Sequence, residues 1–153
     1  MIIVECYADE AFLAQLGISR NKIRHEAGVG KVLEKLEKDH GTAGMIDEDP
    51  GKSRPREIRN YIIEKDRPDH SMMVHKEKNV HLLVLKPDLE GWLVNKARSL
   101  KVNMTDFNLP DDPDRLHSRP RYDRELGFGK LIRELMKKDD SISQLVEWLD
   151  TCG

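Results

Sequence analysis

Two short acidic clusters, each at the end of an apolar run, carry the residue types best suited to chemistry. Glu5 follows the apolar residues 2–4, and Asp47 and Asp49 follow the apolar residues 43–46. Such short runs are typical of buried strands in a parallel sheet, and ligands of these sheets gather at the carboxyl ends of the strands. Converging carboxylates repel one another unless a cation or shared protons neutralise them. Because Mg²⁺ prefers oxygen ligands, the pattern predicts metal-assisted phosphoryl chemistry.

The cluster Asp47-Glu48-Asp49 has two interpretations. Alternate residues of an extended stretch point to the same side, so Asp47 and Asp49 can reach one ion while Glu48 points elsewhere. However, Asp, Pro and Gly together are also typical of a solvated turn, and this stretch continues with Pro50-Gly51. Glu5 favours the metal site, because a charged residue that ends an apolar strand usually has a function.

Two further carboxylates are candidates at the starts of helices. Asp9 would lie in the first turn of the helix after Glu5, and Glu90 in the first turn of the helix after an apolar run at 80–85. Each can either join the acidic site or stabilise a helix N-terminus electrostatically. Both alternatives stay open from the residues alone.

Basic residues lie close to the second acidic cluster. Lys52, Arg54 and Arg56 follow it directly, and positive charge beside an acidic metal site favours a polyanionic substrate. Lys31 follows Gly28-Val29-Gly30, which lacks the spacing of a P-loop but can bind one phosphate at a helix N-terminus.

A second basic group surrounds Tyr122 and contains Arg119, Arg121 and Arg124. It falls in a polar, proline-containing stretch, so we interpret it as solvated surface. The six histidines form no zinc-binding pattern.

The elements that position these residues follow from the periodicity of apolar residues. Strands are expected at 2–4, 21–26, 43–46, 71–74 and 80–85. Helices are expected at 8–16, from 28 onward, at 57–64, 89–100, 129–138 and 141–150, with Ser141 as the cap of the last one. Residues 101–124 should be mostly irregular. This order predicts an α/β fold with a mainly parallel sheet flanked by helices. One domain is expected, with its core in 1–100 and a loop and helical C-terminal extension in 101–153.

The amino-acid composition and the length of the chain predict a soluble protein of one domain. The chain has 153 residues, 35% of them charged and 38% hydrophobic, with a net charge of −2. This charge gives no overall attraction to nucleic acid or membrane, although a local basic strip can still bind nucleic acid. We find no apolar run of membrane-spanning length and no signal-peptide pattern. With only two cysteines, a reduced, cytoplasmic protein is expected.

In combination, these motifs resemble the TOPRIM domain shared by type IA topoisomerases, DnaG-type primases and the overcoming-lysogenisation-defect nucleases. That pattern is a Glu after the first strand, usually followed by Gly, and a DxD after a later strand. Cys6 stands here in place of the Gly. The segment Pro87-Asp88-Leu89-Glu90-Gly91-Trp92-Leu93 resembles a Pro-x-Leu-Glu-x-Trp-Leu stretch in small stand-alone TOPRIM-like proteins of bacterial and phage genomes. Trp92 and Leu93 are expected to pack in the core.

The resemblance implies a TOPRIM-like, Rossmann-like fold and a nuclease that uses Mg²⁺ or Mn²⁺ to cut DNA or RNA. Two alternatives stay open. One is a non-catalytic TOPRIM-like module that binds a partner such as an ATPase, and the other is an Asp-based phosphohydrolase. Carried over residue by residue, the catalytic site would consist of Glu5, Asp9, Asp47, Asp49 and Glu90, with Glu5, Asp47 and Asp49 as metal ligands.

Overall fold

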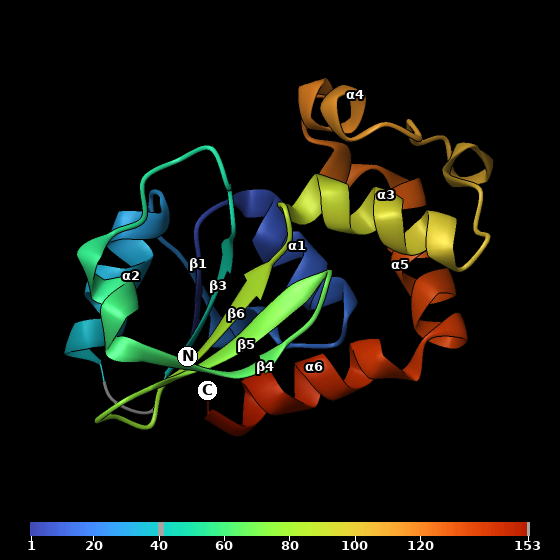
Figure 1. Ribbon diagram of the computed structural model, residues 1–153. Helices are drawn as coiled ribbons and strands as arrows, with labels where there is room; N and C mark the ends of the chain where they lie inside the picture. Colours follow the sequence, from blue (N-terminus) through green and yellow to red (C-terminus); the bar gives the residue numbers. More distant parts are fainter. Residues whose placement is uncertain (40–41, 153) are drawn as a thin grey trace.

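The computed structural model describes residues 1–39 and 42–152, apart from the side chain of Cys152. Its centre is a single mixed sheet of six strands (Figure 1). These strands are β1 (Ile2–Val4), β2 (Ile23–His25), β3 (Ala43–Asp47), β4 (Tyr61–Asp66), β5 (His70–His75) and β6 (His81–Leu85). Their order across the sheet is β2-β1-β3-β6-β5-β4. The first four in this order run parallel, and β5 and β4 add antiparallel pairs at one edge.

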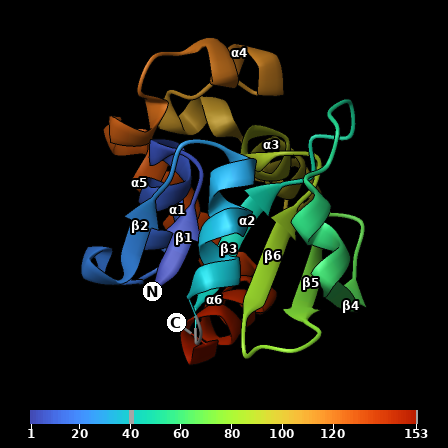
Figure 2. The same cartoon turned by 90° about the vertical axis from the view of Figure 1, so that its left-hand side faces the viewer.

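Helices cover both faces of this sheet (Figures 1 and 2). The predicted α/β class with a mainly parallel sheet is therefore confirmed. The α-helices are α1 (Tyr7–Gln15), α2 (Val29–Lys38), α3 (Leu89–Ser99), α4 (Pro113–Ser118), α5 (Leu126–Lys138) and α6 (Asp140–Cys152). Short 3-10 turns are η1 (Arg20–Lys22), η2 (Arg56–Asn60), η3 (Met104–Phe107) and η4 (Tyr122–Arg124).

Alternation of side chains along the strands gives two separate apolar layers. On one face, Ile3, Leu82 and Val84 pack against α2 and η2. The opposite face packs against α1, α3, α5 and α6 and forms the larger layer. Trp92 and Leu93 are buried in this larger layer, as predicted.

Gly44 in β3 allows α2 to lie close to the sheet. A Cβ atom built on Gly44 would lie 2.6 Å from Cδ1 of Leu36 and 3.3 Å from Cδ1 of Leu82. An alanine there would force the side chain of Leu36, which is buried between α2 and β3, to move.

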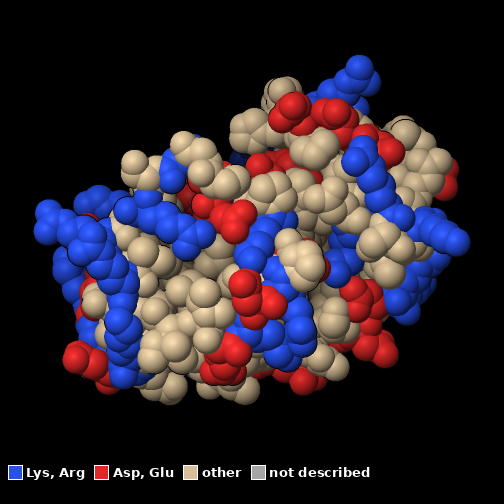
Figure 3. Space-filling model, viewed as in Figure 1, with Lys and Arg blue, Asp and Glu red and all other residues tan. Residues whose placement is uncertain are grey.

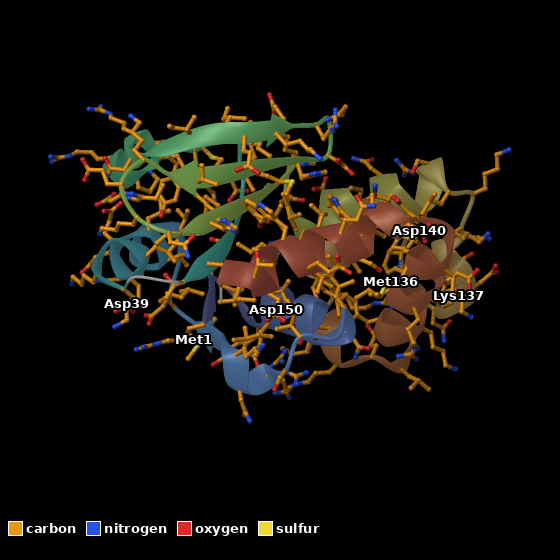
Figure 4. The ribbon with its side chains drawn as sticks, turned by 90° about the horizontal axis from the view of Figure 1, so that it is seen from below. Met1, Asp39, Met136, Lys137, Asp140 and Asp150 are labelled. Carbon is orange, nitrogen blue, oxygen red and sulfur yellow. The ribbon has the colours of Figure 1, made fainter. Side chains whose placement is uncertain are left out.

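The C-terminal part of the chain belongs to the same core. Met104, Leu116 and Phe128 are fully buried within the larger apolar layer. Seen from below, α6 crosses the sheet from Asp140 to Asp150, which lies near Met1 (Figure 4). Its Trp148 ring stacks on the ring of His81 with centroids 4.3 Å apart. The C-terminal helix α6 therefore packs directly against β6.

Three sequence predictions are wrong or incomplete. Residues 57–64 are not a helix, because they divide into η2 and the edge strand β4, where Tyr61, Ile62 and Ile63 are typical strand residues that pair with β5. Residues 101–124 contain η3, α4 and η4 rather than mostly irregular loop. Finally, Asp139 rather than Ser141 caps α6, since its Oδ1 accepts hydrogen bonds from the amide and the hydroxyl of Ser141.

Candidate metal centre

Three carboxylates converge at the carboxyl ends of β1 and β3. One oxygen from each of Glu5, Asp47 and Asp49 lies within 4.8 Å of the other two. The strands are parallel neighbours in which Val4 is paired with Met45, so the residues that follow them emerge side by side. The backbone amide of Asp47 also donates to Oε1 of Glu5 at 3.0 Å. The predicted convergence of these three residues is confirmed.

Backbone hydrogen bonds fix the second cluster against the end of β6. The amides of Glu48 and Asp49 donate to the carbonyls of Leu85 and Pro87 at 2.8 and 2.9 Å. Asp49 has a positive φ of 43°, a conformation that Asp tolerates better than most residues. The chain then turns back, with Nζ of Lys52 3.6 Å from Oδ2 of Asp49.

Asp9 is a fully buried acid in the first turn of α1, close enough to Glu5 and Asp47 to interact with them electrostatically. Its Oδ2 accepts a hydrogen bond from Sγ of Cys6 at 3.0 Å. Among the described residues, its Oδ1 has no hydrogen-bond partner. Burial raises the pKa of Asp9 to about 7, and the charges of Glu5 and Glu90 add to the effect.

Asp47 is the most strongly perturbed acid of the group. Burial raises its pKa to about 9, reinforced by the charges of Asp9, Glu5, Asp49 and Glu90. Its Oδ1 is also buried without a hydrogen-bond partner in the part of the chain that is described. Burial raises the pKa of Glu5 too, against the opposing hydrogen bond from the Asp47 amide. A bound cation would stabilise these clustered carboxylates, and their oxygen ligands suit Mg²⁺ or Mn²⁺.

Glu90 faces this group from the first turn of α3 but is held by two other side chains. Its Oε1 accepts a hydrogen bond from the hydroxyl of Tyr122 at 3.0 Å and lies 3.2 Å from Nδ1 of His117. A Cβ on Gly91 would lie 2.8 Å from the ring of Pro87, so Gly91 allows the start of α3 to pack closely there.

Of the basic residues predicted to bind substrate after the second acidic cluster, two lie beside the acidic group and one does not. Lys52 and Arg54 line a cavity of about 60 Å³ that also contacts Asp47 and Asp49. Arg56 begins η2 and is exposed, and it is absent from the described lining of that cavity. Figure 3 shows Lys and Arg side chains gathered at the left, over the region that α2 and η2 occupy in Figure 1.

Lys31 does not join the acidic group in the structure. It lies on the exposed side of α2, with its Nζ 3.3 Å from Oε2 of Glu34. Its assignment to phosphate binding stays a prediction.

Three contacts of the site were missed from the sequence. Tyr122 and His117 come from the stretch expected to be irregular, and nothing in their local sequence points to Glu90. Cys6 was noticed only as a departure from the TOPRIM pattern. Its spacing of three residues from Asp9 within a helix start was the signal for their hydrogen bond.

Comparison of the chain with protein-family models, curated proteins and solved structures found no match. Within the described residues, no helix has the length and apolar character needed to cross a membrane. Function is therefore inferred from the geometry of the site itself.

Proposed function

We propose that the protein is a Mg²⁺- or Mn²⁺-dependent phosphodiester hydrolase that acts on nucleic acid. The observation that carries the proposal is the meeting of Glu5, Asp47 and Asp49 within 4.8 Å. Their position at the carboxyl ends of adjacent parallel strands supports it, because ligands bind at this edge in α/β folds. The Glu-then-DxD order on β1 and β3 is also the order that the TOPRIM resemblance implies.

The chain's own residues have separable roles in this proposal. Asp47 and Asp49 would hold the ion with Glu5, and the bound ion would orient the phosphate, stabilise developing charge and activate water. Lys52 and Arg54, which line the adjoining small cavity, would bind the phosphate of the substrate. Burial raises the pKa of Glu5 above its ordinary value, so its carboxylate accepts a proton more readily than a solvated glutamate does.

The remaining groups position the site. Tyr122 and His117 hold Glu90 beside the acidic group. Burial and the neighbouring Asp9 raise the pKa of the Cys6 thiol, so Cys6 stays protonated and serves as a hydrogen-bond donor rather than a nucleophile.

The test compares wild type with Asp47→Asn, which removes one charge and preserves shape. Titration calorimetry with Mn²⁺ should show binding to wild type and at least a tenfold loss of affinity in the variant. Labelled single-stranded DNA and RNA should be cut by wild type in Mg²⁺ or Mn²⁺, and EDTA should stop the reaction. Asp106→Asn is the matched control, since Asp106 is an exposed acid outside the site, and it should behave as wild type.

Two outcomes would count against the hydrolase. Wild type that binds no divalent cation contradicts the metal centre itself. Binding of Mn²⁺ without cleavage, also after addition of a candidate partner ATPase, would leave the non-catalytic binding module as the better proposal.

A further inference from the structure

A separate cavity is lined by arginines together with the acids Glu10, Asp123 and Glu125. Its volume is about 540 Å³, within the range of small-molecule sites. It is lined by residues of α1, η4 and α5 together with Arg20. Helices α1 and α5 lie side by side in Figures 1 and 2. Four arginines contribute to its lining, namely Arg20, Arg121, Arg124 and Arg133.

Two of these arginines have no carboxylate partner among the described residues. Arg20 is paired with Glu10 at 2.9 Å and Arg121 with Asp123 at 2.9 Å. The structure assigns no ion pair to Arg124 or Arg133 in its described part, although Arg133 donates to Oε1 of Gln15 at 3.3 Å. These two guanidinium groups are available for an anion, and Arg is well suited to phosphate because of its fork of donors.

Three planar side chains, His25, Tyr7 and Arg121, stack in a column at the edge of the same cavity. The rings of Tyr7 and His25 are stacked, with centroids 4.4 Å apart and planes 10° apart. The guanidinium carbon of Arg121 lies 5.2 Å from the centroid of the Tyr7 ring. Tyr7 is 56% exposed, which is unusual for an aromatic ring with so much apolar surface. Tyr7 and Arg121 line the cavity, so they present this column to its interior.

The cavity and the acidic group share two short segments of chain. Tyr7 lies between Glu5 and Asp9 at the start of α1. Arg121 and Asp123 flank Tyr122, whose hydroxyl donates to Glu90 at 3.0 Å. The cavity and the acidic group are therefore joined through the start of α1 and through η4, which contact each other.

We propose that this cavity binds one unpaired nucleotide of a nucleic-acid strand, with its base stacked on the Tyr7–Arg121 column and its phosphate held by Arg124 and Arg133. Bases stack on aromatic rings and guanidinium planes alike, and only unpaired bases expose a face for this contact. The inference rests on the proposed function and adds that the substrate is single-stranded near the cut.

The test measures binding in EDTA, where no cleavage intervenes. Fluorescence anisotropy would compare a labelled dT12 strand with a duplex of the same length, and unlabelled dTMP would compete with the strand. We expect dT12 to bind at least tenfold more tightly than the duplex and at least tenfold more tightly than dTMP. Equal binding of strand and duplex would overturn the proposal, and equal binding of dTMP would show a site for free nucleotides instead.

Variants locate the binding in this cavity. Tyr7→Leu should weaken dT12 binding at least fivefold, because Arg121, on which the base stacks, loses the ring that supports it, whereas Tyr7→Phe should keep it. Arg121→Lys retains the charge but loses the plane and should also weaken binding. Arg124→Gln should lower the salt dependence of binding by about 0.7 in slope. Lys130→Gln removes an exposed charge from α5 outside the cavity and is the matched control.

The two proposals can fail separately. If Tyr7→Leu and Arg124→Gln bind dT12 as wild type does while Mn²⁺-dependent cleavage is present, the nucleotide site is wrong and the hydrolase stands. If dT12 binds as expected but nothing is cut, the hydrolase is wrong and the nucleotide site stands.

Discussion

Two groups of carboxylates near α3 differ in how far neighbouring cations neutralise them. At its start, Glu90 faces the acidic group of Glu5, Asp47 and Asp49. In its last turn, Lys96 places Nζ 2.7 Å from Asp69 and 3.0 Å from Asp139. The second group is a network of neutralised charges. In the first, the one cation paired with an acid among the described residues is Lys52, 3.6 Å from Asp49.

The pKa values follow this difference. The hydrogen bond with His70, and then Lys96, lower the pKa of Asp69 despite partial burial. Burial and neighbouring carboxylates raise that of Asp47 to about 9. A paired carboxylate stabilises the fold, whereas unpaired acids held together reduce stability until a ligand neutralises them. An acidic group that lowers the stability of the fold is typical of a ligand site, which agrees with the proposed metal centre.

The largest expected effect comes from a buried ring in α3, which lies 5.5 Å from Nζ of Lys96. Trp92 is buried in α3 between Glu90 and Lys96, edge-on to Phe12 with centroids 5.2 Å apart. Trp92→Ala should lower the free energy of unfolding by about 3–5 kcal/mol because of the lost burial and the cavity left behind. Urea denaturation measures this. A change below about 1 kcal/mol would show that α3 does not depend on this ring.

Substitution of Asp47 should have the opposite sign. In EDTA at pH 8, Asp47→Asn should raise the free energy of unfolding by about 2–3 kcal/mol. Burial and like charges make an ionised Asp47 costly in the folded protein, so folding must take up a proton that Asn does not need. Asp106→Asn should stay within about 0.5 kcal/mol of wild type. Urea denaturation of both variants gives the comparison, and a destabilised Asp47→Asn would contradict the repulsion inferred here.

The same substitution in the paired network should instead destabilise. Asp69→Asn leaves Lys96 with one partner and weakens the contact to His70, so we expect a loss of about 1.5–2 kcal/mol. Measured beside Asp47→Asn under identical conditions, it tests whether the two groups really differ. If both variants change the free energy of unfolding in the same direction, the acidic group and the Asp69 network do not differ as inferred.

A further expected effect is a dependence of the free energy of unfolding on pH. Acids with raised folded pKa values contribute stability that is fully present below about pH 4, the unfolded pKa of Asp. It is lost as pH rises through about 7 for Asp9 and about 9 for Asp47. Melting in EDTA should therefore show stability falling from pH 5 to pH 9, less steeply in Asp47→Asn.

Added divalent cation should restore part of the stability that is lost at high pH. At ten times its Kd at pH 8, Mn²⁺ should add about 1.4 kcal/mol to the wild type, and less at pH 6, where protons compete with it. Thermal melting at both pH values provides the measurement. A shift of equal size in wild type and Asp47→Asn would mean that the ion binds elsewhere.

Much of the acidic group was predictable because it depends on strand ends. Residues 2–4 and 43–46 are apolar enough to be buried strands, and parallel neighbours bring Glu5 and Asp47 to one edge. The strand β4 was not predictable in the same way, because 57–64 can also satisfy a helical pattern. Its pairing with β5 decided between the two.

The sequence by itself determined the α/β class, the parallel strands β1 and β3, and the meeting of Glu5, Asp47 and Asp49. These depend on local apolar runs and on a rule of parallel sheets. Only the tertiary structure decided that Tyr122 and His117 hold Glu90, and that Arg121 and Tyr7 border one cavity. Such contacts join residues far apart in the chain, and they depend on how α1, α3 and α5 pack, which no spacing in the sequence records.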